Sequence, residues 1–165
     1  MKKIIASVSI VSIVSMFVAT FALAATTGQV TATVTASVIA VTVGDGAVAY
    51  GVVATNKDTT ASGVNDTQTI TNTGTVTEDF SVKGNSSASW TLGASAGDAI
   101  YAHKTCITTC DATPTWTAMG LTYTSLAASK APAGTTDMDL QITVPTANPT
   151  VTQQSVPVDV LATLH

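Results

Sequence analysis

The sequence predicts an all-β protein in which about eight or nine short strands pack as a two-sheet antiparallel β-sandwich. Three observations support this prediction. Polar and apolar residues alternate in short runs, turn residues separate these runs at intervals of about eight to twelve positions, and apolar residues do not recur at helical spacing. Because no long linker interrupts the pattern, a single domain is expected over residues 25–165.

Residues 1–24 have the composition of a cleaved signal peptide. Lys2 and Lys3 precede an apolar run, and Ala22 and Ala24 supply the small residues that signal peptidase requires. The mature chain is then expected to begin near Ala25 and to be secreted to the cell surface or the extracellular space, with no membrane segment left. The alternative is a retained anchor, because the run approaches the ~20 residues that span a bilayer. Cleavage is favoured because no basic cluster follows the run.

The mature chain is predicted to open with an extended strand over residues 25–43. Its apolar residues fall first on even positions and then on odd ones: Val30, Ala32, Val34, Ala36 and Val38, followed by Ile39, Val41 and Val43. This change of phase indicates a bulge or a crossing between sheets. The five even-position residues are candidates for a subunit interface, because a free strand can add to the open sheet edge of another copy. The alternative is that the segment folds back as the first strand of its own domain.

The clearest pair of strands spans residues 67–83. The apolar side chains all lie on even positions: Ile70, Val76, Phe80 and Val82. A strand directs alternate side chains to opposite faces, so the even face is expected to be buried. Asn72 and Gly74 lie between the two runs, and both residue types tolerate the positive φ of tight turns. The stretch is therefore predicted to form a β-hairpin.

Shorter alternations predict the remaining strands, at residues 48–52, 88–92, 100–104, 121–126, 138–144 and 156–160. Trp90 is expected to point into the core. Pro157 lacks the N–H donor that a central strand uses, so the last strand is expected at a sheet edge or near a bulge.

Three segments share the turn and core residues of a known family: Ala49-Tyr50-Gly51-Val52-Val53, residues 68–76, and Phe80 to Gly84. They show an aromatic-Gly-x-Val sequence, a strand that ends in Asn-x-Gly, and a following strand that closes with glycine. From about Val41 to Leu92 the chain therefore resembles the Ig-like domains of the ASPM, SPD-2 and Hydin type, whose bacterial relatives occur in cell-surface proteins. The resemblance implies an Ig-like sandwich and a scaffolding or adhesion role.

Cys106 and Cys110 are the only cysteines. In an exported chain, two cysteines predict a disulfide. The alternative, a metal-binding pair, is disfavoured because there is no further cysteine and because His103 and His165 are not at ligand spacing. No metal or cofactor is therefore expected.

Charge and composition restrict the class of partner. Residues 25–165 contain 31 threonines, four lysines, no arginine and ten acidic residues, so their net charge is −6. Phosphate binding needs clustered cations, so nucleic acids and anionic lipids are not expected as partners.

No catalytic motif is found, and the protein is not expected to be an enzyme. The chain has no glycine-rich phosphate loop and no HExxH or GxSxG sequence. His103 has no nucleophile at a recognisable spacing and is expected on an exposed strand face. Asp137 and Asp139 share one face and could hold a cation, but they provide too few ligands for calcium, so a solvated face is preferred.

These observations favour a structural or adhesion protein of the cell envelope, such as a surface-layer or filament subunit that assembles through its N-terminal strand. Its partners would be copies of itself or other envelope proteins. The alternative is a carbohydrate-binding module in which Tyr101, Trp116 and Tyr123 stack on sugar rings. It is disfavoured because most of the few aromatic residues are needed in the core. Polysaccharide retention that is lost in Trp116→Ala but kept in Thr122→Ala would identify such a module.

Overall fold

The structure, a computed structural model, confirms the all-β fold. It describes residues 28–55, 57–59, 67–107, 110–147 and 152–165, and the signal peptide expected at residues 1–24 lies outside these ranges. Within them, ten strands form two sheets, and no helix of a length and hydropathy suited to crossing a membrane is found. The chain divides into residues 1–35 and a unit from Ala36 to His165, which holds all of these strands.

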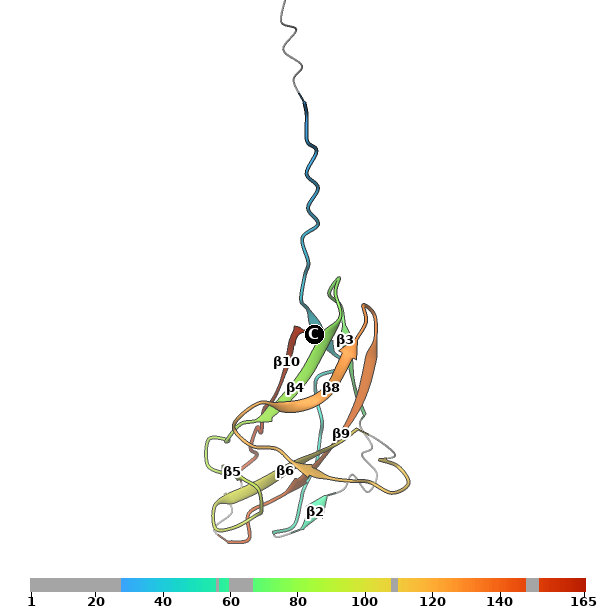
Figure 1. The fold of residues 1–165 in the computed structure, drawn as a ribbon. Coiled ribbons are helices and arrows are strands. Elements are labelled where there is room, and N and C mark those ends of the chain that lie inside the picture. The colour runs from blue at the N-terminus through green and yellow to red at the C-terminus, as the bar shows by residue number, and fades with distance from the viewer. Residues whose placement is uncertain (1–27, 56, 60–66, 108–109, 148–151) are drawn as a thin grey trace, which may run out of the picture. The chain divides into compact units, whose positions relative to one another are not determined.

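In chain order the strands are β1 (Val41–Val43), β2 (Asp58–Thr59), β3 (Gln68–Asn72), β4 (Glu78–Gly84), β5 (Thr91–Gly93), β6 (Ile100–Cys106), β7 (Thr117–Ala118), β8 (Thr124–Lys130), β9 (Thr135–Thr143) and β10 (Val158–Leu164). The larger sheet has the order β1-β3-β9-β6-β5, with β2 on β9 and β7 on β6, and the smaller sheet has the order β10-β4-β8. Of the named pairs, only β5 with β6 is parallel. Figure 1 shows β4, β8 and β10 near β3, with β2, β5 and β6 toward the opposite end of the unit.

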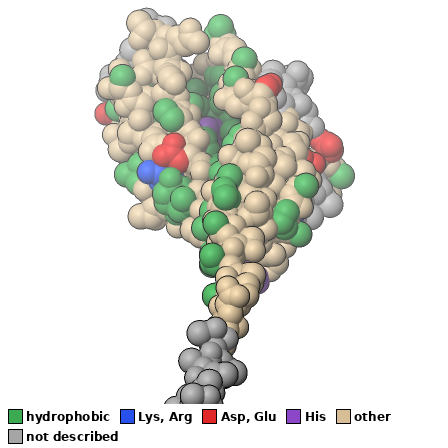
Figure 2. Space-filling view, turned by 90° about the horizontal axis from the view of Figure 1, so that it is seen from above, with side chains coloured by type: hydrophobic (Ala, Val, Ile, Leu, Met, Phe, Trp, Pro, Cys, Tyr) green, Lys and Arg blue, Asp and Glu red, His purple; other side chains and the backbone are tan. Residues whose placement is uncertain are grey.

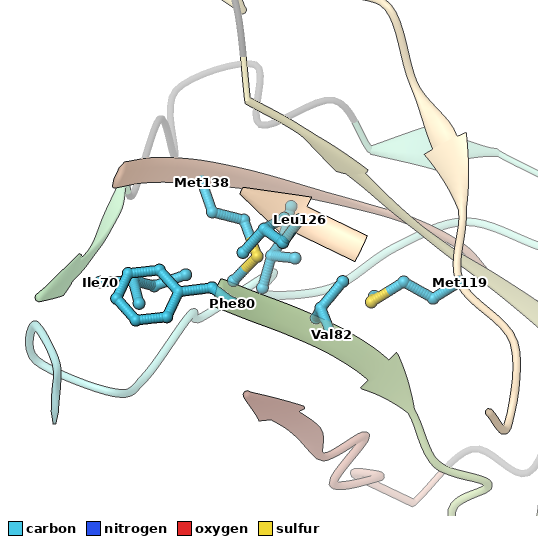
Figure 3. Packing of buried hydrophobic residues seen from close by; sticks show 7 residues of the cluster. Ile70, Phe80, Val82, Met119, Leu126 and Met138 are labelled. Carbon is cyan, nitrogen blue, oxygen red and sulfur yellow. The ribbon is translucent and has the colours of Figure 1, made fainter. Parts of the chain in front are cut away.

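The main core lies between the two sheets. The larger sheet contributes Ile70 from β3 and Met138 from β9, and the smaller sheet contributes Phe80 and Val82 from β4 together with Leu126 from β8 (Figure 3). Ile70, Phe80 and Val82 are at most 2% exposed, so the predicted burial of their even face is confirmed. Full burial of such side chains contributes about 1.5–3 kcal/mol each.

Residues 67–83 form an arch between the sheets, and the predicted hairpin is wrong. β3 pairs with β1 and β9, whereas β4 pairs with β10 and β8. Neither Asn72 nor Gly74 has a positive φ. Instead, the buried Asn72 side chain donates to the carbonyl oxygens of Val76 and Lys130, both at 2.8 Å, and accepts from the Gly74 N–H at 2.8 Å. The alternation fits both outcomes, because an arch and a hairpin bury the same alternate residues.

The strand expected over residues 25–43 is much shorter in the structure. Only β1 remains, where Val41 and Val43 are partly buried and Thr42 is exposed. The odd-position phase of this part is therefore confirmed, whereas residues 28–40 belong to no strand.

Residues 38–40 are fixed to the arch by polar contacts. The Thr75 N–H donates to the Val38 carbonyl oxygen at 2.9 Å, and the Val38 N–H donates to the Thr75 hydroxyl at 3.0 Å. The Ala40 N–H donates at 2.8 Å to Oε1 of Glu78, whose carboxylate is fully buried. Gly74 is required beside it, because a Cβ there would overlap this oxygen and the Val38 carbonyl oxygen. Side-chain oxygens of Thr75 and Glu78 thus take the Val38 and Ala40 N–H groups that a longer β1 would use in its ladder.

Two further predictions are confirmed. Cys106, the last residue of β6, forms a disulfide with Cys110. Pro157 directly precedes β10, which lies at the edge of the smaller sheet. An edge strand tolerates the missing N–H of proline.

Candidate functional site

A groove of about 1420 Å³ opens on the unit formed by residues 36–165, between residues 46–55 and residues 152–158. Figure 2 shows a hollow with hydrophobic side chains along its inside. Among the described residues that line the groove, none is Asp, Glu or Lys. The groove is therefore suited to an uncharged, largely apolar occupant.

The floor of the groove is one face of β9 and the residue that follows it. Met138, Leu140, Ile142 and Val144 all line it, and each is 8% exposed or less. These residues are two positions apart, as the strand repeat requires for side chains on one face. The regular alternation of residues 138–144 thus places four apolar side chains along one face, and they form the floor.

The walls of the groove are formed by irregular chain on one side and by the start of an edge strand on the other. Residues 44–55 and 152–157 belong to no strand, and Gly46 and Gly51 have positive φ values of 69° and 66°. Val158 and Val160 belong to β10, the edge of the smaller sheet. An edge strand can accept a further strand through its backbone groups.

Gln68 holds the first wall in place. This residue is 3% exposed, and its Oε1 accepts from the Gly46 N–H at 3.0 Å. Its Nε2 donates to Oδ1 of Asp45 at 3.0 Å and to the Ala47 carbonyl oxygen at 3.3 Å. The Ala47 N–H and the Gln68 amide lower the pKa of Asp45. The loop is therefore built around a buried amide rather than around a sheet ladder.

His103 lies in the wall of the groove and not on an exposed face, so that prediction is wrong. The residue is 1% exposed, and its Nε2 lies 2.7 Å from the hydroxyl of Tyr50. Its Nδ1 is buried without a hydrogen-bond partner among the described residues. Burial lowers the pKa of His103 to about 4. The imidazole is therefore neutral near pH 7 and is well suited to an apolar site.

Tyr101 is buried completely, and its prediction as an exposed sugar contact is wrong. It packs against Trp90, with ring centroids 6.2 Å apart, and its hydroxyl donates to the Asn85 carbonyl oxygen. Burial raises the pKa of Tyr101 to about 12. Trp90 itself is only partly buried, packed against the cluster of Leu92, Tyr101 and Ile142, so its core position is correct only in part.

The other two candidate carbohydrate contacts differ from each other. Trp116 is partly buried, whereas Tyr123 is 42% exposed. The Lys83 ammonium lies 5.0 Å from the centroid of the Tyr123 ring. A cation on this ring competes with a sugar for the same face.

The candidate interface residues of the N-terminal segment are exposed. Val30 is 93% exposed and Val34 is 96% exposed, and Ala32 and Ala36 are also exposed. Val38 is 51% exposed and is tied to Thr75 by the two hydrogen bonds given above. Val38 thus belongs to the anchor of the segment, and the free part ends before it.

The two aspartates on β9 lie in different environments. Asp137 is exposed and accepts a hydrogen bond from the Thr69 hydroxyl at 2.7 Å, as a solvated face predicts. Asp139 is 7% exposed, contrary to that prediction, and lies opposite Cys106 of the neighbouring strand β6. Among the described residues, no group of three or more His, Cys, Asp and Glu side chains could hold a metal ion.

Asp79, His165 and Ser129 form a cluster with the residue types of a catalytic triad. Nδ1 of His165 lies 2.8 Å from Oδ1 of Asp79, and Nε2 lies 2.9 Å from the Ser129 hydroxyl oxygen. That oxygen is also 3.3 Å from Nδ1, so it does not lie along the Nε2 bond direction, as a nucleophile would. Asp79 also accepts from the Ser129 N–H at 2.8 Å. The cluster therefore ties the end of β10 to β8 and does not support catalysis.

No protein family, curated protein or solved structure matches this chain. The fold and the groove define the class on their own: an all-β sandwich with an apolar groove beside an edge strand. Tyr50, Gln68 and His103 were not predicted as site residues, because their roles depend on contacts 22 to 53 positions apart in the sequence. Pro157 was the one local signal, since it indicated the edge strand.

Proposed function

We propose that this protein is a secreted structural subunit of the cell envelope whose copies assemble by exchanging their N-terminal segments. The observation that carries the proposal is the state of residues 28–37. They alternate small apolar residues with threonine, belong to no strand, and have exposed side chains throughout. Alternation of this kind is typical of a strand with one buried face.

Exposure of this segment leaves hydrophobic surface available for assembly. Burying a valine side chain contributes about 1.5–3 kcal/mol, and Val30 and Val34 are more than nine-tenths exposed. Pairing with a sheet edge would add main-chain hydrogen bonds. Valine and threonine also suit a pleated strand better than a helix.

The anchor at Val38 determines how much of the segment is donated. Because both polar backbone groups of Val38 bind Thr75, the donated part comprises residues 29–37. A donor segment and an acceptor edge at different places on each copy form a heterologous contact. Such contacts continue from copy to copy, and they produce filaments unless the rotation closes a ring.

Export of the chain is part of the proposal. The composition of residues 1–24 favours secretion, and the Cys106–Cys110 disulfide is compatible with an oxidising compartment. The net negative charge keeps subunits soluble before they assemble.

The size of the secreted protein tests the proposal. Light scattering and electron microscopy are expected to show assemblies far larger than one chain, and a variant without residues 29–37 is expected to be monomeric with an unchanged thermal midpoint. A variant in which a glycine-serine sequence of equal length replaces these residues controls for length. Full-length protein that stays monomeric at every concentration would refute assembly, and assemblies that persist without the segment would refute its role.

A further inference from the structure

We infer that the groove lined by residues of β9 and β10 is the acceptor for residues 29–37 of a second copy of this chain. This inference rests on the proposed function and adds the place where the segment binds. Residues 46–55 and 152–158 form the walls, and β9 forms the floor.

The repeat of the floor matches the repeat of the segment. The floor has four apolar side chains spaced by two positions: Met138, Leu140, Ile142 and Val144. The segment before the Val38 anchor also has four, spaced by two: Val30, Ala32, Val34 and Ala36. Strands on packed layers keep this spacing along their length, so one register places the four apolar side chains of the segment along the floor, whose residues each keep 2–8% of their surface exposed. Threonines on the opposite face of the segment would then point to water.

The edge of β10 provides the backbone partners for an added strand. β10 is the outer strand of the smaller sheet, and its residues Val158 and Val160 line the groove. A strand placed there would extend the smaller sheet from three strands to four. The irregular first wall, with positive φ at Gly46 and Gly51, has no ladder of its own to be displaced.

Charge and size also agree with this occupant. Residues 29–37 carry no charged side chain, and the described lining of the groove carries no Asp, Glu or Lys. His103 is neutral at pH 7 because of its burial. The side chains of the segment that would face the floor are valines and alanines, which are smaller than Met138 and Leu140 of the floor. A charged peptide would find no charged Asp, Glu or Lys partner among the described residues of the lining.

The position of the anchor favours a second copy over the chain's own segment. Val38 is bound at the arch, next to Thr75. The pairing of β3 with β9 places Met138 opposite Gln68, at the end of β3 away from the arch. From Met138 the floor continues further away, to Val144. The Val38 anchor therefore lies at the arch end of β3, whereas the floor extends from the opposite end of β3, and a head-to-tail assembly uses two such separate places on each copy.

Two variants separate the donor from the acceptor. Val34→Asp places a charge on the exposed segment and should abolish donation, while Thr33→Asp is its control on the other face. Val156→Asp places a charge in the wall of the groove and should abolish acceptance, while Leu161→Asp on the exposed face of β10 is its control. Ala49→Trp, at an exposed residue of the groove, is a second acceptor variant that fills the space without a buried charge.

Mixing the variants tests the inference by light scattering. Each of the donor and acceptor variants alone is expected to be monomeric, and an equimolar mixture is expected to form dimers only, because one competent segment meets one competent groove. Both controls are expected to assemble as the unchanged protein does. Monomers in the mixture would overturn the inference, because the free segment of Val156→Asp would then have failed to enter the free groove of Val34→Asp. If Val156→Asp and Ala49→Trp assemble as the unchanged protein does while Val34→Asp is monomeric, the acceptor lies elsewhere. If the unchanged protein itself does not assemble, the proposed function is refuted.

Discussion

The hydrogen bond between Tyr50 and His103 connects the first wall of the groove to β6, and burial determines its chemistry. The Tyr50 hydroxyl lies 2.7 Å from Nε2, and Tyr101 packs on the imidazole with ring centroids 6.1 Å apart. Tyr101 is neutral because burial raises its pKa to about 12. Neither Tyr50 nor Tyr101 therefore supplies a negative charge that would stabilise an imidazolium at His103.

Stability is expected to fall as the pH drops from about 6.5 to about 4. The unfolded chain carries His103 with its ordinary pKa of 6.5, whereas the folded pKa is about 4, so the unfolded state binds the extra proton in this window. The neutral His103 makes its full contribution to the free energy of unfolding above pH 6.5, and loss of this contribution lowers that free energy by about 3 kcal/mol. Urea unfolding at pH 7 and at pH 4.5 measures this difference in the free energy of unfolding.

His103→Gln is the matched variant, because glutamine keeps an acceptor for Tyr50 but does not titrate. It should lose much less stability between the two pH values than the unchanged protein. Asp45 and Asp79 have lowered pKa values, so their contributions are lost at lower pH, as the pH falls below the ordinary value of 3.8. An equal loss in both proteins would show that His103 is not the group that titrates.

Asn72 is expected to be the most sensitive polar residue of the arch. Its side chain is fully buried and makes three hydrogen bonds, so Asn72→Ala leaves three backbone groups without this partner. A loss of about 3 kcal/mol in the free energy of unfolding is expected. Asn85→Ala, whose amide makes one long contact of 3.4 Å to Pro157, should cost less than about 1 kcal/mol. Similar values for the two variants would contradict this account of the arch.

At the scale of the element, alternation predicted which residues of β3 and β4 are buried but not how the strands pair, and on β9 it missed the burial of Asp139 and Gln141. The even positions within β3 and β4 are inside, as expected, whereas Val76 between the two strands is only partly buried. The arch is held by contacts outside this stretch: the Asn72 side chain donates to the Lys130 carbonyl oxygen, and the Glu78 carboxylate accepts from the Ala40 N–H. Such contacts join residues that are distant in sequence, so no local pattern reports them.

The first wall of the groove also shows that alternation alone does not establish a strand. The alternation at Val48, Tyr50 and Val52 predicted a strand, yet this stretch is irregular and Val52 is fully exposed. Gly51 has a positive φ, which breaks the pleat at its centre. By contrast, Pro157 did indicate an edge strand, because a missing N–H is a local property.

Trp90 tests the packing of the smaller cluster around β5 and β6. Trp90→Ala should lower the free energy of unfolding by about 3 kcal/mol, because the side chain packs on Leu92 and Tyr101. Trp90→Phe should cost much less, since it keeps most of the apolar contact and removes an indole N–H that is buried without a partner among the described residues. A cost below about 1 kcal/mol for the alanine variant in urea unfolding would show that the cluster does not depend on this ring.

At the scale of the whole molecule, assembly would join features that are unrelated within one chain. The exposed apolar segment, the apolar groove and the edge of β10 each leave surface or backbone groups uncovered. Strand exchange would cover all three at once. The uncharged character of the segment and the groove gives the further expectation that assembly depends little on salt, unlike contacts between charged surfaces.

A cross-link between two chains tests the central claim most directly. Both native cysteines are in the Cys106–Cys110 disulfide, so cysteines introduced as Val34→Cys in one batch and Val156→Cys in another are the only free thiols. Mixing and oxidation are predicted to yield a covalent dimer of the two variants, while Leu161→Cys in place of Val156→Cys yields little. The exchange of segments between copies would be contradicted if Val34→Cys linked equally well to Val156→Cys and to Leu161→Cys. It would also be contradicted if the link formed only when Val34→Cys and Val156→Cys are in the same chain.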